Sequence, residues 1–463
     1  MRIRADLTDD ILSGLHGIRR QFKIPADFPP EVLQAAAAAA ERAPDANGHL
    51  DRTDWPFVTL DPASSTDLDQ AFHIETIGND LLLHYAIADV AWFVDDSDAL
   101  DDEAWTRGAT QYLPDGKASL YPPVLCEGAA SLLPDGVRPA VVFHVRVDPQ
   151  GQSKIDGVER SAIRSRAKLA YETVKPSDLP DAFPELARRI ALAEDTRGAS
   201  RVEPAEQVVE ATGKGGYDIS FRPRLQSEDD NAAMSLATNL AIADLLFAAG
   251  TGLFRVMPDP DARAEQRLRH TARALGIEWD ATTSLHDLAR SLDGTSAKSA
   301  ALQMAIRRAG GHASYVPFIP GNRPWHSAVA ATYAHGTAPL RRLADRYVVM
   351  AALAIANGKP VPETIAAAFP KLPDVMERAD DTANQVERAI IELAEVALLS
   401  AQTQHTFGAV VTDVDERGAR IQLCDLPVVS RLSAHNVAPG DDVRVRVVST
   451  DIPARTVVLE RVA

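Results

Sequence analysis

Cysteine is scarce in this sequence: its 463 residues include two, Cys126 and Cys424, which lie far apart in the chain. Two cysteines in so long a chain predict no disulfide framework and no disulfide-linked partner. Long apolar runs are also missing, since the longest, such as residues 35–40 and 240–249, fall short of the roughly 20 residues that a membrane-spanning helix needs. The N-terminal segment lacks the apolar core of a secretory signal. We therefore expect a cytoplasmic protein with no membrane partner.

Lysine is rare as well. Of the 48 basic residues 9 are lysine and 39 are arginine, against 65 acidic residues and a net charge of −17. A simple nucleic-acid binder usually has a basic excess, so the charge argues against that class. It does not exclude an enzyme that holds RNA in a local channel, because a patch matters more than the sum. Arginine suits bidentate phosphate contacts, although biased genome composition explains the same excess.

The pattern of residue types changes twice along the chain, and the length predicts about three domains. Helical spacing of apolar residues runs from Asp9 to Phe22, and a second, alanine-rich helix follows Pro30. A turn-rich linker at residues 44–48 ends this part. Strand patterns then fill residues 54–148. A largely helical stretch follows, with helices expected at 228–249, 261–275, 296–309, 338–357 and 372–402.

The last segment, from Phe407 to the end, returns to short strands. Five strand patterns with turns between them fit into about 55 residues, which suits a small closed barrel of the oligonucleotide-binding (OB) kind.

The densest chemical signal is the segment DPASSTDLDQ, residues 61–70, between two strand patterns. It places Asp61, Asp67 and Asp69 within nine residues. Crowded carboxylates are unfavourable unless a cation compensates for them, and Mg²⁺ prefers one or two carboxylates together with water and substrate phosphate. The alternative is an acidic surface turn, in which aspartates serve as turn residues. An EF-hand is excluded, because the segment lacks the required glycine and the closing glutamate.

This segment resembles the acidic motif of the ribonuclease II family, whose catalytic RNB domain carries four aspartates in the pattern D-x5-D-x-D-D. The match here is Asp61, Asp67 and Asp69, with Gln70 in the fourth place. Further segments match in the family's order and extend the resemblance over most of the chain: IADV at 87–90, TQYLPDG at 110–116, YAHGTAPLRRLAD at 333–345 and NQVERA at 384–389.

The resemblance implies an α+β multidomain chain. A mixed α/β RNB catalytic domain would span residues 51–402, and a five-stranded OB-fold barrel of the S1 type would span 403–463. Residues 1–50 depart from the family, whose members commonly begin with cold-shock-type barrels. We expect a helical module there, either helix-turn-helix-like or a plain helical cap on the next domain.

The resemblance also implies roles for the acidic residues. Asp61 and Asp67 would bind Mg²⁺, with Mn²⁺ as a substitute, and Asp69 would be both a metal ligand and the carboxylate most critical to hydrolysis. In a two-metal site the ions stabilise the attacking and the leaving oxygen. Gln70 would be a metal ligand or lie just behind one. Its amide offers a neutral oxygen in place of a charge, so one metal site should be weaker.

The resemblance assigns the remaining roles to residues further along the chain. Arg341 would grip the scissile phosphate, for which a guanidinium fork is well suited, and Arg342 matches the adjoining basic residue. Tyr112 would stack on the 3′-terminal bases without regard to sequence. Glu387 would lie near the terminal nucleotide. Without the resemblance, we would interpret the two arginines and Glu387 as ordinary charges on helix surfaces. Tyr112 would be a core or turn residue.

Asn231 falls where many members place a glutamate that contacts the ribose. An asparagine still hydrogen-bonds a 2′-hydroxyl, but selection of RNA over DNA should be weaker. His73, His84 and His335 invite metal or acid–base roles, and we interpret all three as structural.

The resulting hypothesis is a monomeric, Mg²⁺-dependent 3′→5′ exoribonuclease that hydrolyses single-stranded RNA to nucleoside 5′-monophosphates in RNA processing and decay. The first alternative is a catalytically impaired RNB-type RNA-binding protein, which Gln70 favours. The second is a metal-dependent phosphohydrolase of small molecules, which leaves the terminal barrel unexplained.

Overall fold

The structure, a computed structural model, describes residues 8–45, 48–134, 136–199, 206–212, 216–292, 297–415, 418–433 and 436–462. Residues 46 and 47 of the predicted linker, residue 296 of a predicted helix and both ends of the chain lie outside the described residues. All of the predicted site residues lie within them.

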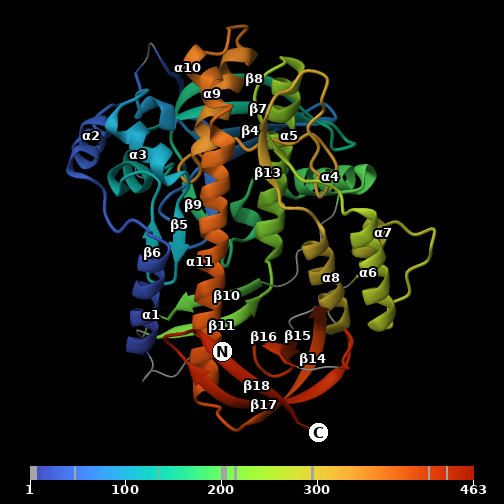
Figure 1. Cartoon of the computed structure of the whole chain (residues 1–463). Helices are drawn as coiled ribbons and strands as arrows, with labels where there is room; N and C mark the ends of the chain where they lie inside the picture. The colour runs from blue at the N-terminus through green and yellow to red at the C-terminus, as the bar shows by residue number, and fades with distance from the viewer. Residues whose placement is uncertain are drawn as a thin grey trace.

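A seven-stranded mixed sheet forms the centre of the larger part of the molecule (Figure 1). Its strand order is β1-β8-β7-β4-β3-β2-β9. The pairs from β8 to β2 are antiparallel, whereas β1 and β9 pair in parallel with β8 and β2. The strands are β1 (Leu50–Arg52), β2 (Val58–Asp61), β3 (Gln70–Ile77), β4 (Asp80–Ala88), β7 (Arg138–Val147), β8 (Ser153–Ile163) and β9 (Ala167–Ala170).

The strand region is longer than predicted. The sequence placed its end near Asp148, but β8 and β9 continue the sheet to Ala170. The sequence of β8, SKIDGVERSAI, is mostly polar, and its three buried residues, Val158, Ser161 and Ile163, all lie in its second half. A strand of this kind is held by its neighbours on both sides, β7 and β1, rather than by its own hydrophobic pattern.

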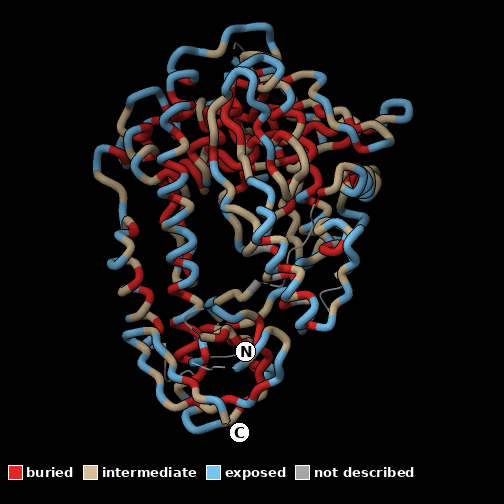
Figure 2. The backbone as a smooth tube through the Cα atoms, turned by 45° about the vertical axis from the view of Figure 1, so that its right-hand side comes forward, coloured by how far each residue is buried: buried red, intermediate tan, exposed pale blue. Residues whose placement is uncertain are grey.

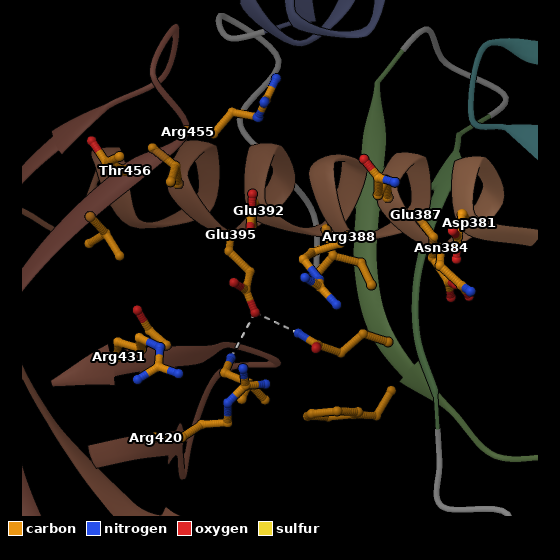
Figure 3. A pocket seen from close by; sticks show the side chains of 18 of the residues that line it. Asp381, Asn384, Glu387, Arg388, Glu392, Glu395, Arg420, Arg431, Arg455 and Thr456 are labelled. Atoms are coloured by element: carbon orange, nitrogen blue, oxygen red, sulfur yellow. Dashed lines mark hydrogen bonds between the residues drawn. The ribbon is translucent and has the colours of Figure 1, made fainter. Parts of the chain in front are cut away.

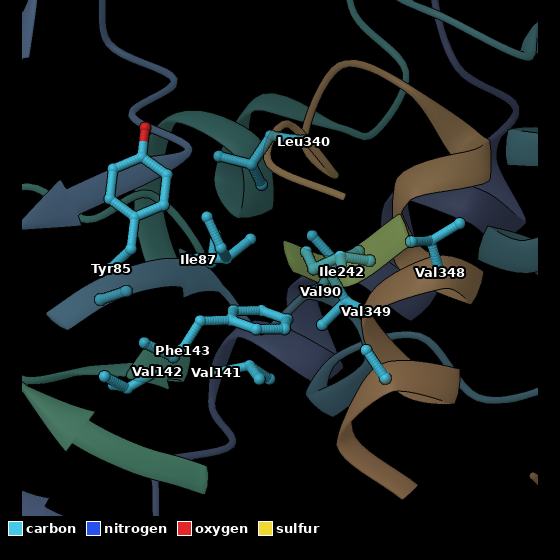
Figure 4. Packing of buried hydrophobic residues seen from close by; sticks show 14 of the residues in the cluster. Tyr85, Ile87, Val90, Val141, Val142, Phe143, Ile242, Leu340, Val348 and Val349 are labelled. Atoms are coloured by element: carbon cyan, nitrogen blue, oxygen red, sulfur yellow. The ribbon is translucent and has the colours of Figure 1, made fainter. Parts of the chain in front are cut away.

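Two helices pack against this sheet and form its core: α5 (Gln226–Ala248) and α9 (Leu343–Ala356). Ile242 and Val348 of these helices belong to the same hydrophobic cluster as Ile87, Val141 and Phe143 of the sheet (Figure 4). In the described part of the chain, α5 is the one helix long and apolar enough to cross a membrane, but half of its apolar window is buried inside the protein. A core helix passes the same test. The helix α4 (Phe183–Arg197) packs against α5, and its Phe183 stacks on Phe72 of the sheet.

The longest helix, α11 (Leu372–Ser400), runs from the sheet to the C-terminal barrel (Figure 1). The barrel has the five strands that the sequence predicted, in the order β16-β15-β14-β17-β18. The edge strands β16 and β18 lie against each other, which nearly closes the barrel. Its strands are β14 (Thr406–Asp415), β15 (Gly418–Leu423), β16 (Val429–Leu432), β17 (Asp442–Asp451) and β18 (Thr456–Val462). Figure 2 shows that buried residues gather in the sheet layer and again inside the barrel.

The two predicted N-terminal helices are present as α1 (Thr8–Gln21) and α2 (Pro30–Ala40). They belong to different hydrophobic cores. The buried residues of α1 pack with α11 and the barrel, whereas those of α2 join the core of the sheet. The pair therefore matches the helical cap rather than the helix-turn-helix alternative, because the helices of the latter share one core.

Most of the other predicted helices are also confirmed, although α9 begins five residues later than expected, because residues 338–342 form a turn around Pro339. The remaining elements are α3 (Ala99–Arg107), β5 (Gln111–Leu113), β6 (Gly116–Ala118), β10 (Glu206–Ala211), β11 (Tyr217–Arg222), β12 (Leu253–Val256), α6 (Ala262–Ala274), α7 (Leu285–Ser291), α8 (Ala297–Ala309), β13 (Ser314–Pro317) and α10 (Glu363–Ala368). The helices α6, α7 and α8 share a small core of their own.

Candidate active site

The acidic segment connects the end of β2 to the start of β3 and is fastened to the protein by its backbone. Leu68 is completely buried, and its N–H donates to Ser131 Oγ at 2.9 Å. The same hydroxyl donates to the carbonyl of Thr66 at 2.7 Å. Lys168 Nζ donates to the carbonyls of Ala63 and Ser65. Because Leu68 points into the core, its neighbours Asp67 and Asp69 are fixed on either side of it.

Asp69 is the most buried of the three aspartates, with 3% of its surface exposed. Its Oδ1 accepts a hydrogen bond of 2.7 Å from the N–H of Leu340. Its Oδ2 lies 3.3 Å from Nε of Arg341. Burial raises the pKa of Asp69 to about 7, although Arg341 and the Leu340 N–H act in the opposite direction.

Arg341 thus lies directly against the acidic segment, 272 positions away from Asp69 in the sequence. Leu340 is buried in the core (Figure 4), so its neighbour Arg341 is held at the surface of that core. The carbonyl of Arg341 accepts from the N–H of Thr110 at 3.0 Å. The Arg341 side chain is 47% exposed, which leaves a large part of the guanidinium accessible to a ligand.

Asp67 is contacted by two residues of the β5–β6 hairpin. Tyr112 Oη donates to Asp67 Oδ2 at 3.2 Å, and Lys117 Nζ lies 2.8 Å from Oδ1. Lys117 also lies 3.1 Å from Glu127. Tyr112 is 54% exposed, as a residue on which a base stacks requires. Burial, followed by the charge of Asp67, raises the pKa of the Tyr112 hydroxyl, so this group remains a hydrogen-bond donor.

Asp61 ends β2 and lies close enough to feel the charges of Arg341, Asp67 and Lys168. Burial raises its pKa to about 7, and Arg341 opposes this effect. Among the described residues, none donates a hydrogen bond to its carboxylate. The structure therefore brings Asp61, Asp67, Asp69 and Arg341 together at one place.

This donor set fits a hard cation. Two carboxyl groups with a raised pKa, the half-buried Asp61 and the buried Asp69, are stabilised in their charged form by a nearby positive ion. Within the described ranges, no three His, Cys, Asp or Glu side chains converge closely enough to hold one ion between them. A site of one or two carboxylates completed by water and phosphate is the usual arrangement for Mg²⁺. The residues present are consistent with that arrangement.

Gln70 is half-buried at the start of β3, and its Nε2 donates to the buried carbonyl of Thr337. This bond ties the acidic segment to residues 336–342, the turn that carries Arg341. An aspartate in this position has no N–H to donate. The amide therefore makes a structural contact that a fourth carboxylate would not make.

Arg342 has a different environment from Arg341. Its guanidinium forms a two-pronged ion pair with Asp345, with distances of 3.0 and 2.8 Å. Asp345 is completely buried and also accepts from the N–H of Ala338 at 2.7 Å. The contacts of Arg342 thus hold the turn 338–342 in place.

Asn231 lies behind Asp61, on α5. Its Nδ2 donates to Tyr171 Oη at 2.8 Å and to the carbonyl of Leu60 at 3.3 Å. Burial and the charge of Asp61 raise the pKa of Tyr171. Asn231 is itself buried, so of this pair the half-buried Tyr171 is the more accessible to a ligand.

The comparison with known families is decisive at this point. Residues 50–356 match the model of the RNB domain, and residues 405–462 match that of the RNase II-type exonuclease C-terminal S1 domain. The chain belongs to the RNB family. The resemblance stated from the sequence is confirmed, and so is the fold class that it implied.

Ribonuclease R from Thermotoga maritima is 26% identical over 454 residues, which cover 91% of this chain and 63% of that relative. The chain thus spans less than two thirds of the relative's length. Among solved structures, Mycoplasma genitalium RNase R in complex with ribose methylated single-stranded RNA has a TM-score of 0.87 at 21% identity, covering 98% of this chain and 78% of that one.

Yeast Ssd1, a pseudonuclease, also shares the fold, with a TM-score of 0.68 at 17% identity, covering 87% of this chain and 53% of that one. The RNB fold therefore accompanies both a nuclease and a pseudonuclease. The activity of this chain therefore has to be inferred from its own side chains.

Glu387 is not among the described residues that contact the three aspartates. It lines a cavity of about 840 Å³ between α11, the β10–β11 hairpin and the S1 barrel (Figure 3). The cavity is rich in arginine and also holds a buried carboxylate. Its charged lining residues are Asp381, Glu387, Arg388, Glu392, Glu395, Arg420, Arg431 and Arg455. Glu395 accepts from Gln207 and from the N–H of Val429, both at 2.7 Å, which fastens the barrel to α11.

The three histidines that we interpreted as structural have partners outside the acidic segment. His84 Nδ1 lies 2.7 Å from Nδ1 of His144, and burial followed by His144 lowers the pKa of His84 to about 4. His73 stacks on His84. His335 is bonded to Tyr315 Oη at 2.7 Å, and burial lowers its pKa. Two of these rings are therefore neutral near pH 7.

Sequence reasoning missed four residues of the site: Lys117, Lys168, Tyr171 and Asp345. Asp345 falls in the matched segment 333–345, which gave a signal for it. Lys117 follows the matched segment TQYLPDG directly. No sequence pattern singled out Lys168 or Tyr171, because both come from the strand region that extends beyond the predicted limit.

Proposed function

We propose that this protein is a metal-dependent 3′→5′ exoribonuclease that releases nucleoside 5′-monophosphates from single-stranded RNA. The observation that carries the proposal is the contact between Arg341 and Asp69, because it puts a phosphate-binding cation beside the acidic segment. Membership of the RNB family and the RNase R relatives support the same activity. The S1 barrel supports an RNA substrate.

In this proposal Asp61, Asp67 and Asp69 contribute to binding Mg²⁺, or Mn²⁺ in its place, with one or two carboxylates for each ion completed by water and phosphate and the Gln70 amide as a further ligand or just behind one. The ion would supply charge stabilisation for the attacking and leaving oxygens of the phosphodiester. Arg341 would bind the scissile phosphate through the part of its guanidinium that Asp69 leaves accessible. Tyr112 would stack on a terminal base, and its hydroxyl bond to Asp67 would keep its ring beside the reacting phosphate.

Other residues would act by holding these groups. Arg342 would contribute to RNA binding mainly through the turn that it fixes with Asp345. Asn231 would orient the hydroxyl of Tyr171 toward a ribose. Glu387 would meet RNA in the arginine-rich cavity between α11 and the barrel.

The proposed division of the chain is residues 1–50 for the helical module, 51–402 for the catalytic domain and 403–463 for the S1-like domain. We further propose that the protein acts as a monomer in the cytoplasm.

The test uses single-stranded RNA labelled at its 5′ end, incubated with Mg²⁺ and the wild-type, Asp69→Asn or Asp96→Asn protein. We expect a ladder that shortens from the 3′ end in the wild type and in Asp96→Asn, since Asp96 is exposed and lies outside the site. Asp69→Asn should lose about 10²–10³-fold in rate, the usual cost of removing one group that stabilises developing charge. Internal cuts, or equal rates for both variants, would overturn the proposal.

The second candidate is an RNA-binding protein without nuclease activity, which Gln70 and the likeness to the pseudonuclease Ssd1 favour. It predicts that the wild type binds the same RNA and releases no mononucleotide at any Mg²⁺ concentration. If the protein were instead a phosphohydrolase of small molecules, it would hydrolyse free nucleotides, and adding RNA would not change that rate.

A further inference from the structure

The β5–β6 hairpin presents one face to the acidic segment and the other to the core formed by α11, α1 and the barrel. Tyr112 and Lys117 are directly opposite each other in the hairpin, and both bind Asp67. Leu113 and Ala118 face the other way and are buried in the core that α1 shares with α11 and the barrel. The hairpin thus joins the core that contains α1 and α11 to Asp67.

The hairpin is too short to fix these side chains by itself. Each strand has three residues, joined by a two-residue turn. An isolated two-stranded hairpin is marginally stable at best. Its exact placement therefore depends on what packs behind it, and Figure 1 shows α1 beside α11 and below the hairpin.

Arg19 of α1 is bonded to the tip of this hairpin. Its Nε donates to Asp115 Oδ2 at 3.1 Å and its terminal nitrogen to Oδ1 at 2.9 Å, and the same nitrogen reaches the carbonyl of Gly116 at 3.4 Å. The two side chains are only 20% and 12% exposed. A two-pronged arginine–carboxylate pair fixes orientation as well as distance, and partial burial protects it from screening by salt.

The helix α1 is itself held firmly. Ile11, Leu15 and Ile18 are almost completely buried against α11 and the barrel. Gly14 lies so close to α11 that an added Cβ would be 2.6 Å from Leu393 Cδ1. The helix is therefore a fixed support, and Arg19 extends this support to the hairpin tip.

We propose that Arg19 is a positioning residue of the active site: α1, through the Arg19–Asp115 pair, sets the β5–β6 hairpin so that Tyr112 and Lys117 meet Asp67. The inference rests on the proposed exoribonuclease activity. It gives helix α1 a role in placing the groups around Asp67 from a distance.

The test measures kcat and KM on single-stranded RNA for Arg19→Ala, Asp115→Ala and the exchanged pair Arg19→Asp with Asp115→Arg. The two alanine variants should each lower kcat about tenfold, because small displacements of positioned groups are costly, and raise KM by no more than Tyr112→Ala does. The exchanged pair should recover most of the loss. Arg42→Ala is the matched control, because Arg42 forms a similar fork with Asp95 between the same helical module and the next domain.

A second readout does not depend on turnover. RNA with 2-aminopurine at its 3′ end is bound to proteins that carry Asp69→Asn, and quenching of its fluorescence reports stacking on Tyr112. Adding Arg19→Ala should reduce the quenching toward the level of Tyr112→Ala, and adding Arg42→Ala should leave it unchanged.

Unaltered kcat and quenching in Arg19→Ala would overturn the inference, as would an equal loss in Arg42→Ala. A wild type that releases no mononucleotide would overturn the proposed function instead, and the quenching would still test the position of Tyr112.

Discussion

At the scale of single residues, the site is governed by the cost of burying charge. Asp61 and Asp69 are both deep enough that burial raises their pKa to about 7. Arg341 lies beside both and opposes this effect without cancelling it. A carboxyl group with so high a pKa loses its proton near neutral pH when a metal ion binds to it. A cation is favourable here because these carboxyl groups are buried, and not because they are numerous.

This linkage predicts how Mg²⁺ affects stability at different pH values. Without metal, a carboxyl whose pKa is raised in the folded protein favours the folded state at low pH. This contribution to the free energy of unfolding is lost as the pH rises through about 7. Because Mg²⁺ binds the deprotonated form, it should raise the melting temperature more at pH 8 than at pH 6. Thermal unfolding with and without Mg²⁺ measures this difference.

The control is the double variant Asp61→Asn, Asp69→Asn, in which the Mg²⁺ effect should vanish at both pH values. A shift of equal size at pH 6 and pH 8 in the wild type would contradict the prediction.

At the scale of elements, the site depends on a turn that joins distant parts of the chain. Residues 336–342 precede α9 and are held by Asn239, Asp345 and Asp69. The turn also receives the bond from Gln70. Arg341 therefore reaches Asp69 because α5, α9 and the acidic segment all fix the same seven residues.

The pair Arg342–Asp345 should consequently be important for folding. Asp345→Ala removes the partner of Arg342 and of the Ala338 N–H, and breaking a buried ion pair costs about 3–5 kcal/mol. Urea unfolding should show a loss of that order. Asp415→Ala is the matched control: its pair with Arg431 is exposed, and the cost should be below about 1 kcal/mol. Equal losses in the two variants would contradict the role of the turn.

At the scale of the whole molecule, α11 connects the RNB sheet to the S1 barrel, and the arginine-rich cavity lies along it (Figure 3). The chain as a whole carries a charge of −17. The cavity is lined by four arginines and four acidic residues, so arginines that could meet phosphate lie there without a basic excess. The cavity also contains Glu387, Glu392 and Glu395, which keeps its charge mixed.

If RNA passes through this cavity, its affinity should depend on salt through the arginines there. Replacing Arg388 and Arg420 by alanine, in an Asp69→Asn background that does not cleave, should weaken binding. The slope of log affinity against log salt should become shallower by about 1.4, at about 0.7 per phosphate contact on a single strand. Filter binding over a range of salt concentrations measures the slope.

The comparison variant is Arg188→Ala, on the exposed face of α4, which should leave the slope unchanged. An unchanged slope in the double variant would place the RNA path elsewhere.

The sequence by itself determined the acidic segment, the five strands of the barrel and the long helices, because these depend on local spacing and hydrophobic period. It also indicated the family, through short segments that match in order. It could not reveal β8, whose polar sequence forms a strand only between its neighbours. The resemblance placed Glu387 near the terminal nucleotide. This stays a prediction, and in the structure Glu387 lines the cavity beside the barrel.

The tertiary structure decided which residues meet. The contact between Arg341 and Asp69, the bond from Gln70 to Thr337 and the fork between Arg19 and Asp115 each join residues about a hundred or more positions apart. Such contacts have no periodicity in the sequence, because they result from how the sheet, α11 and α1 pack together. The sequence determines the chemistry of each side chain, whereas the packing of the elements determines which side chains come together.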